Sequence, residues 1–488
     1  MELSSFEKKN IHVIGASGAE GSAILLFLYN NLKNKNITAH DFCKKSEFKQ
    51  SFNSFHDGYN KKEKEVLFAE LKDLPIVYNF HNDYLDDIKK ADIIFVPQSW
   101  YRYENNKELK KYQKKIKFYN ITKLYFELAS CPIIAVTGTS GKTTTTRLIN
   151  NIVEKSDKKV FFTGNDRLNE QILDNIKDMQ EDDLLVMEVS NRQLKIDMEK
   201  SPRIALITNI TPSHLDDHDS YEDYIKTKKS LLNYQTDEDF AILNYDNYAT
   251  KKIGEDSNAK VYYFSRRKIL DKGCFVKNNN IVLKYKDREY IICSLHDLQI
   301  PGPHNIENIL AASLATYLVG VSTKAIREGI ISYKGTKSRL ELFEEIKGVK
   351  YYEDSSACNP DGPLYAVQSF KTPIILIAGG IRKVGKTNEF VEVAQAIVKN
   401  NVKALFLIGD KAQEIEDAVR KELEKVGNDK LLIKKCLDLE EAVTNSYNSA
   451  QRGDVVVLSP GCESFDMFKD YRDRGRKFKK LVRLLKNK

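Results

Sequence analysis

The sequence predicts an α/β protein of three domains, each built on a largely parallel sheet. At 488 residues the chain exceeds the size of a single hydrophobic core. An apolar strand, a glycine turn and a helical pattern recur along it, as "NIHVIGASGAEGSAILLFLYNN", "PIIAVTGTSGKTTTTRLINNIV" and "TPIILIAGGIRKV". Continuous runs of Val, Ile and Leu between helices are typical of parallel strands covered on both faces.

Two changes in pattern divide the chain. One precedes "CPIIAV" and the other lies at "SYKGTKSRLEL", which gives domains of residues 1–125, 126–335 and 336–488. Residues 240–300 read differently, with short alternating runs and an Asn-rich turn. This segment predicts antiparallel hairpins appended to the middle domain, whose sheet is therefore mixed.

Composition excludes several classes of protein. The net charge of +8 is modest, and basic runs such as "KKYQKKIKFY" are more typical of solvated helix faces than of nucleic-acid binding. No apolar run reaches the roughly 18 residues of a membrane span, and "MELSSFEKKNIHVIG" lacks a signal-peptide core. Seven scattered cysteines without C-x-x-C argue against disulfides and structural zinc. We expect a soluble, cytoplasmic protein without nucleic-acid partner or membrane insertion.

The first glycine turn has two open interpretations. Gly15, Gly18 and Gly21 follow a strand and open a helix, and Asp41 ends a second strand about 20 residues later. The spacing is G-x-x-G-x-x-G rather than G-x-G-x-x-G. The turn either holds a nucleotide diphosphate on a helix N-terminus or is simply a tight strand–helix connection.

The second glycine turn, "TGTSGKTT", predicts a phosphate-binding loop. Gly138 and Gly141 leave room for backbone N–H groups to face phosphate oxygens. Lys142 is placed to reach the β- and γ-phosphates, and Thr143 to offer a hydroxyl to Mg²⁺ at a helix N-terminus. Val136 stands where the common pattern has its first glycine.

Polar residues follow the next predicted strands in order. One strand ends on Glu188, another at Asn209 before His214, and a helix then carries Lys228. Open α/β sheets bind ligands at the carboxyl ends of their strands, where Glu188 and His214 are plausible Mg²⁺ ligands. Taken alone, His214 is as well explained as an ordinary loop histidine.

Five motifs in one order carry a resemblance: "TGTSGKTTTT", "GPHNIENILAA", "SRLEL", "YYEDSSACNP" and "LSPGCESFDMFKDYRDRGRKF". Together they resemble the Mur ligases, ATP-dependent amide-forming enzymes of bacterial cell-wall precursor synthesis, and the last motif is most similar to the D-glutamate-adding members. The resemblance spans about residues 10 to 485. It implies a UDP-binding Rossmann-like domain, a P-loop ATPase-like central domain and a Rossmann-like C-terminal domain. Separately, we expect a monomer.

The resemblance also implies a reaction. ATP phosphorylates the carboxylate of UDP-N-acetylmuramoyl-L-alanine, the amine of D-glutamate attacks the acyl phosphate, and ADP and phosphate leave. Phosphorylation supplies the leaving group that a carboxylate lacks, so catalysis consists mainly of charge neutralisation and positioning by Mg²⁺, Lys and backbone N–H groups.

The resemblance assigns roles residue by residue. ATP contacts fall on Gly138, Thr139, Ser140, Gly141, Lys142, Thr143, Thr144, Asn308, Arg339 and Asp354. Catalytic roles fall on Lys142, His214 and Lys228. Ligands to two Mg²⁺ ions fall on Thr143, Glu188, His214 and Lys228, the lysine as its carbamate. Substrate contacts fall on Gly15, Gly18, Asp41, Asn165, Ser190, Gln193, Cys358, Lys383, Ser464 and Tyr471.

Some assignments keep an alternative. Lys226 and Lys229 are close enough to Lys228 for the register to slip. Tyr471 is equally explained by packing, and Lys383 by the capping of a turn.

The sequence departs from the family pattern near both substrates. Asn191 and Arg192 are unusual in "EVSNRQL", Ser213 replaces a frequent Asp, Cys358 replaces a Thr, and "VPQSW" replaces Ser-Pro-Gly. A Mur-type ligase for a different carboxylate or amino acid is therefore the alternative function. A non-catalytic nucleotide-binding scaffold is a third hypothesis, but the phosphate loop and the acid, histidine and lysine that follow it argue against it.

Overall fold

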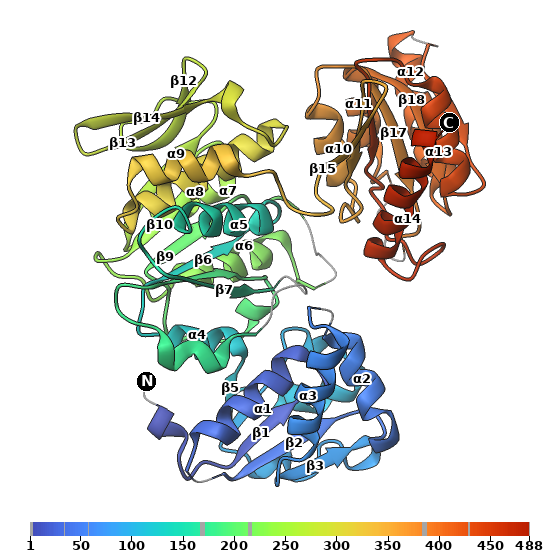
Figure 1. Cartoon of the computed structure of the whole chain (residues 1–488). Helices are drawn as coiled ribbons and strands as arrows, with labels where there is room; N and C mark the ends of the chain where they lie inside the picture. Colours follow the sequence, from blue (N-terminus) through green and yellow to red (C-terminus); the bar gives the residue numbers. More distant parts are fainter. Residues whose placement is uncertain are drawn as a thin grey trace. The chain divides into compact units, whose positions relative to one another are not determined.

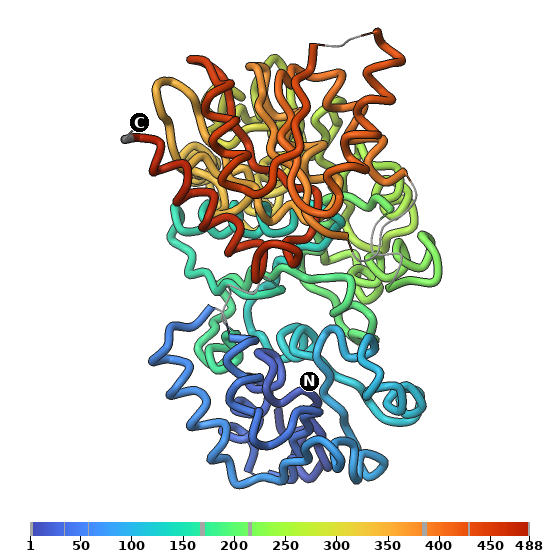
Figure 2. The backbone as a smooth tube through the Cα atoms, turned by 90° about the vertical axis from the view of Figure 1, so that its right-hand side faces the viewer, coloured from blue at the N-terminus to red at the C-terminus, as the bar shows by residue number. Residues whose placement is uncertain are grey.

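The computed structural model describes residues 3–33, 35–56, 58–165, 171–212, 217–382, 388–427 and 430–487. It contains three sheets, which follow one another along the chain, as the colours of Figure 1 show. Figure 2 traces the backbone from the N-terminus in blue to the C-terminus in red. The chain forms two compact units, Met1–Leu295 with Glu307–Ile330 and His296–Ile306 with Ile331–Lys488. The first unit holds two sheets and the second holds one.

The first sheet is parallel, with strand order β3-β2-β1-β4-β5. Its strands are β1 (Ile11–Ile14), β2 (Ile37–Asp41), β3 (Val77–Phe80), β4 (Ile93–Phe95) and β5 (Lys117–Tyr119). Its helices are α1 (Ala19–Asn31), α2 (Phe48–Phe55), α3 (Lys61–Lys72) and α4 (Ile121–Leu128). Chain order reverses between β1 and β4, which creates a crevice at their carboxyl ends.

The second sheet is mixed, with strand order β14-β13-β12-β11-β10-β9-β6-β8-β7. Its strands are β6 (Ile133–Thr137), β7 (Val160–Gly164), β8 (Leu184–Glu188), β9 (Ile204–Ile207), β10 (Phe240–Asn244), β11 (Lys260–Ser265), β12 (Gly273–Lys277), β13 (Asn280–Tyr285) and β14 (Arg288–Ser294). Its helices are α5 (Lys142–Val153), α6 (Tyr221–Lys229), α7 (Tyr248–Glu255), α8 (Pro303–Leu318) and α9 (Thr323–Ser332). The predicted hairpins are confirmed, because β12, β13 and β14 pair antiparallel.

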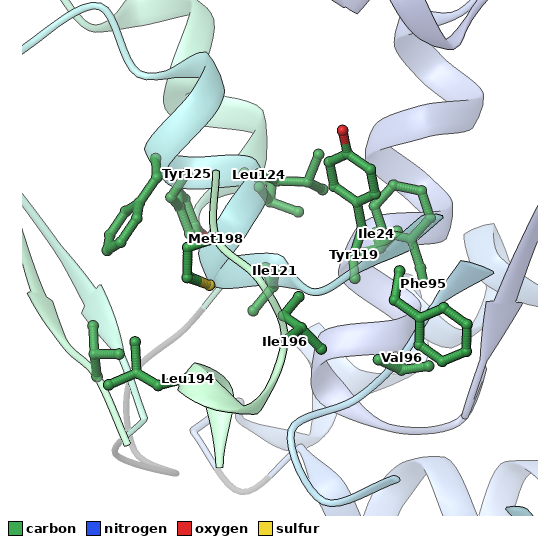
Figure 3. Close-up of a cluster of buried hydrophobic side chains, with 14 of the residues drawn as sticks. Ile24, Phe95, Val96, Tyr119, Ile121, Leu124, Tyr125, Leu194, Ile196 and Met198 are labelled. Atoms are coloured by element: carbon green, nitrogen blue, oxygen red, sulfur yellow. The ribbon is translucent and has the colours of Figure 1, made fainter. Parts of the chain in front are cut away.

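One continuous buried core joins these two sheets. In Figure 3, Ile121 and Leu124 of α4 lie in one cluster with Ile196 and Met198, which follow β8. The proposed boundary after residue 125 falls inside α4, whose buried side chains belong to this shared core.

The third sheet has the order β15-β16-β20-β17-β18-β19, with only β15 antiparallel to its neighbour. Its strands are β15 (Glu341–Ile346), β16 (Val349–Glu353), β17 (Ile374–Gly379), β18 (Val402–Ile408), β19 (Leu432–Lys435) and β20 (Val455–Leu458). Its helices are α10 (Asp361–Gln368), α11 (Val391–Lys399), α12 (Ala412–Val426), α13 (Leu439–Ser449) and α14 (Tyr471–Leu484). Separate buried clusters form around it, as expected of strands covered on both faces.

The α/β class with three sheets, predicted from the sequence, is confirmed. Among the residues that the structure describes, no helix is both long and apolar enough to cross a membrane.

Candidate active site

The phosphate loop connects β6 to α5. Gly138 and Gly141 have φ of 147° and 86°, a region that favours glycine. A Cβ at Gly138 would lie 1.9 Å from Thr208 Oγ1, and one at Gly141 would lie 2.3 Å from Asn308 Oδ1. Both glycines are therefore required by backbone conformation and by space. Val136 belongs to the incoming strand, where it is fully buried.

Asn209 holds the loop in shape. Its Oδ1 accepts from Ser140 N at 3.0 Å, its Nδ2 donates to Ser140 O at 3.2 Å, and its carbonyl accepts from Thr139 N at 2.9 Å. The strand β9 therefore ends at Ile207, two residues earlier than predicted, because Thr208 and Asn209 turn to bond the loop.

Two lysines share one carbonyl of this loop. Lys142 Nζ donates to Gly138 O at 2.9 Å and to Thr139 O at 3.1 Å, while Lys228 Nζ donates to Gly138 O at 2.9 Å. Both amino groups therefore lie on the phosphate loop, where a triphosphate would compete with these carbonyls as a hydrogen-bond acceptor.

Lys228 is the lysine of α6 that faces the loop. It is 1% exposed, whereas Lys226 is exposed and Lys229 pairs with Asp256 at 3.3 Å. Burial lowers the pKa of Lys228 well below its usual value, and the charge of Lys142 lowers it further, against the opposing effect of Glu188. A neutral amine is consequently accessible at this position.

Glu188 ends β8 beside the loop, opposite Val136 in the parallel register. Its Oε2 accepts from Thr143 Oγ1 at 2.7 Å, and its Oε1 accepts from Asn165 Nδ2 at 3.4 Å. A carboxylate and a hydroxyl are hard oxygen donors, which suit Mg²⁺. These residues fit a magnesium ion at the loop.

His214, and with it Ser213, lies outside the described residues. Within the described ranges, no group of three or more His, Cys, Asp or Glu side chains is arranged to hold a metal ion. The remaining loop residue, Thr144, lies in the first turn of α5.

Asn308 of α8 approaches the loop from the other side. Its Oδ1 accepts from Thr145 Oγ1 at 3.3 Å and lies against Gly141. The side-chain amide is thus placed at the N-terminus of α5, next to the site predicted for the nucleotide.

A cavity of about 200 Å³ opens at the crevice of the first sheet. Its lining includes Gly15 and Gly18 of the glycine turn, Asp41 at the end of β2, and Asn165 from the second sheet. The structure therefore brings together four of the residues predicted to bind substrate. Pro97, Gln98 and Ser99 of the "VPQSW" segment also line this cavity.

Ser190 and Gln193 do not line the cavity but bond residues that do. Ser190 Oγ donates to Gln98 Oε1 at 2.9 Å, and Gln193 Nε2 donates to Glu20 Oε1 at 3.2 Å. Both stand behind the lining rather than in it.

In the second unit, Asp354 follows β16 beside Arg339. Its Oδ2 accepts from Ser459 Oγ at 2.6 Å and its Oδ1 from Leu340 N at 3.2 Å. Burial raises the pKa of Asp354 to about 7, against these hydrogen bonds and the charge of Arg339. The carboxyl that was predicted to contact ATP is thus tied into its own domain.

Two of the predicted substrate residues in the second unit, Cys358 and Ser464, lie near a buried arginine. Arg474 is fully buried and donates to Ser355 O and Cys462 O, both at 3.0 Å. Its guanidinium also lies 4.0 Å from Cys358 Sγ and donates to the carbonyl before Ser464 at 3.3 Å. Three residues earlier, Tyr471 begins α14. Lys383 lies outside the described residues.

Sequence reasoning missed part of the first cavity. The lining residues that the sequence analysis did not name include Glu20, Phe42, Phe55 and Tyr103. A usable signal existed for Glu20, which is the only charged residue in "AEGSAILLFLYNN". The aromatic residues come from separate segments of the chain, so no local sequence pattern predicted that they would line the same cavity.

A phosphate loop with a carboxylate at the end of the neighbouring strand is typical of enzymes that use the phosphates of ATP. Residues 136–316 match the Mur ligase middle domain, and residues 338–462 match the Mur ligase, glutamate ligase domain. The chain belongs to the Mur ligase family.

Its relatives include enzymes that share one name. The chain is 36% identical over 486 residues to UDP-N-acetylmuramoylalanine--D-glutamate ligase of Acetivibrio thermocellus. The aligned region covers 99% of this chain and 98% of that protein. The chain is 36% identical over 427 residues to the protein of the same name from Thermoanaerobacter sp., with 87% and 92% covered.

Solved structures share the fold. A pseudomurein peptide ligase type C from Methanothermus fervidus aligns with a TM-score of 0.58 at 19% identity, covering 98% of this chain and 100% of that one. MurF from Acinetobacter baumannii aligns with a TM-score of 0.60 at 14% identity, covering 100% and 98%.

Proposed function

We propose that this chain is an ADP-forming ligase that adds D-glutamate to UDP-N-acetylmuramoyl-L-alanine through an acyl phosphate. The observation that carries the proposal is the bonded set at the phosphate loop, in which Lys142, Lys228, Thr143 and Glu188 converge. The shared name of relatives that cover nearly the whole chain supports the choice of substrates.

The residues divide the chemical work among themselves. Backbone N–H groups of the loop and the Lys142 ammonium bind the phosphates of ATP and oppose the charge that develops in phosphoryl transfer. Mg²⁺ bound by Thr143 and Glu188 would add further neutralisation of that charge. Asn165, which bonds Glu188 and also lines the first cavity, connects the metal side of the site to the substrate side.

Lys228 is proposed to act as a carbamate. Its neutral amine adds to CO₂, a C–N bond forms, and one proton leaves to solvent, so that a neutral group becomes an anion suited to a second Mg²⁺. The low pKa of the amine supports this step, because only the neutral form is a nucleophile. With ¹³C-bicarbonate, the wild type should show a carbamate carbon signal that Lys228→Ala lacks. Equal spectra would remove the carbamate from the proposal.

The activity test is phosphate release from ATP with UDP-N-acetylmuramoyl-L-alanine and a panel of amino acids. D-Glutamate should be the preferred amine, and Lys142→Ala should abolish release. Release with L-glutamate but none with D-glutamate would contradict the stated specificity.

The second candidate function is a Mur-type ligase for a different carboxylate or amino acid, which is favoured because the altered segment "VPQSW" contributes Pro97, Gln98 and Ser99 to the cavity. Thermal stabilisation by ATP but not by uridine nucleotides would support it.

A further inference from the structure

Glu20 is a buried carboxyl group in the wall of the first cavity. It is the second residue of α1, directly after the turn that contains Gly15 and Gly18. Glu20 lines the cavity together with that turn, and the residue is only 9% exposed. A side chain that is expensive to bury is thus held where the substrate's diphosphate is expected.

Neutral amides hold Glu20 in place. Oε2 accepts from Gln98 N at 2.8 Å, and Oε1 accepts from Gln193 Nε2 at 3.2 Å. Each carboxyl oxygen has two lone pairs, so both bonds persist whether the group is ionised or protonated. The position of Glu20 is therefore independent of its charge.

The charges around the cavity are unfavourable for an anion. Its titratable lining residues are Glu20, Asp41, Tyr84 and Tyr103, and the described lining includes no Lys, Arg or His. Both carboxylate oxygens of Asp41 already accept backbone hydrogen bonds, one from Ser17 N at 2.7 Å and one from Cys43 N at 3.1 Å. An ionised Glu20 would therefore repel a diphosphate bound at the start of α1.

Protonation of Glu20 removes this repulsion and creates a donor. A neutral carboxylic acid offers an O–H to a phosphate oxygen, and such charge-assisted bonds are short and strong. Burial raises the pKa of Glu20 to about 7, against the bonds from Gln98 and Gln193, so the required proton is available near neutral pH.

We propose that Glu20 is a substrate-binding residue that takes up a proton when the diphosphate of the UDP-substrate enters the cavity, and binds that diphosphate as a neutral hydrogen-bond donor. The inference rests on the proposed function for the identity of the ligand. It adds a proton to the binding equilibrium, which the family resemblance does not imply.

The test is calorimetric titration of the whole enzyme with UDP-N-acetylmuramoyl-L-alanine at pH 8 in buffers of different ionisation enthalpy. The wild type should take up about 0.9 proton per site. Its affinity should fall about eightfold between pH 7.5 and pH 8.5. Glu20→Gln, a neutral isostere, should bind without proton uptake, lose this pH dependence, and bind more tightly than the wild type at pH 8.5.

Two controls separate this effect from cavity damage. Ser54→Ala removes the hydroxyl of another lining residue, which donates to Ser51 O of its own helix, so the pH dependence should remain. Uridine, which has no phosphate, should bind the wild type without proton uptake.

Binding of the UDP-substrate without proton uptake, or with equal uptake in Glu20→Gln, overturns the role of Glu20 and leaves the proposed function intact. Absence of binding at any pH overturns both. The wild-type measurement decides the question even if the variant does not fold.

Discussion

A buried histidine pair should limit the stability of the first sheet in acid. His12 of β1 and His40 of β2 are 1% and 0% exposed, and His12 Nδ1 lies 2.8 Å from His40 Nε2. The other nitrogen of His40 donates to Tyr84 O, so His40 Nε2 is the acceptor and His12 Nδ1 the donor when both rings are neutral. This arrangement has no place for an additional proton between the rings.

The pKa shift sets the magnitude. Burial is the main cause that lowers the pKa of His12 from 6.5 to about 4, with the charge of His40 acting in the same direction and that of Asp87 opposing it. Since the folded pKa is the lower one, the unfolded chain binds more protons, and stability falls as the pH decreases from 6.5 toward 4. His12 alone should lower the free energy of unfolding by about 2 kcal/mol at pH 5 relative to neutral pH. His40, whose pKa burial also lowers, adds in the same direction.

Hydrogen exchange of the β1 and β2 amides at pH 7.5 and pH 5, corrected for intrinsic rates, measures this loss locally. His12→Asn retains a donor near the position of Nδ1 but does not titrate. The stability that this variant loses between pH 7.5 and pH 5 should therefore be smaller than the wild-type loss by the contribution of His12. His81→Asn is the matched control, because His81 is exposed at φ 47°, a conformation that Asn tolerates. Equal losses in the wild type and His12→Asn would refute the reasoning.

Two further predictions concern the sites. Thr143→Val removes the hydroxyl that bonds Glu188 and should lower kcat by roughly two orders of magnitude. Thr146→Val is the control and should not lower kcat, because the Thr146 hydroxyl bonds carbonyls of its own helix. Similar kcat values for the two variants would exclude a metal role for Thr143. Phe42 lies at the cavity with its ring 5.3 Å from Tyr103, so Phe42→Ala should raise KM for the UDP-substrate about tenfold at constant kcat. Tyr248→Ala, at an exposed aromatic outside the cavity lining, should leave KM unchanged, and an unaltered KM in Phe42→Ala would remove that ring from the binding site.

Local sequence patterns predicted much of the phosphate-binding site. The phosphate loop was readable because glycine spacing, Lys142 and Thr143 act within one turn of chain, and Glu188 was readable because a polar residue ended an apolar strand. The local pattern alone did not show which of Lys226, Lys228 and Lys229 faces the phosphate loop, since neighbouring positions on a short helix differ only in what they face. The family resemblance selected Lys228.

The sequence by itself determined the α/β class, the three sheets, the appended hairpins and the phosphate loop, because strand, turn and helix signals depend on residues close in the chain. Only the tertiary structure decided which side chains meet across elements. Burial of Lys228 against Gly138 O, the bonds of Glu20 to Gln98 and Gln193, and the pairing of His12 with His40 all join distant segments. The charge state of such groups follows from desolvation and from neighbours in space, and neither quantity is encoded in a short stretch of sequence.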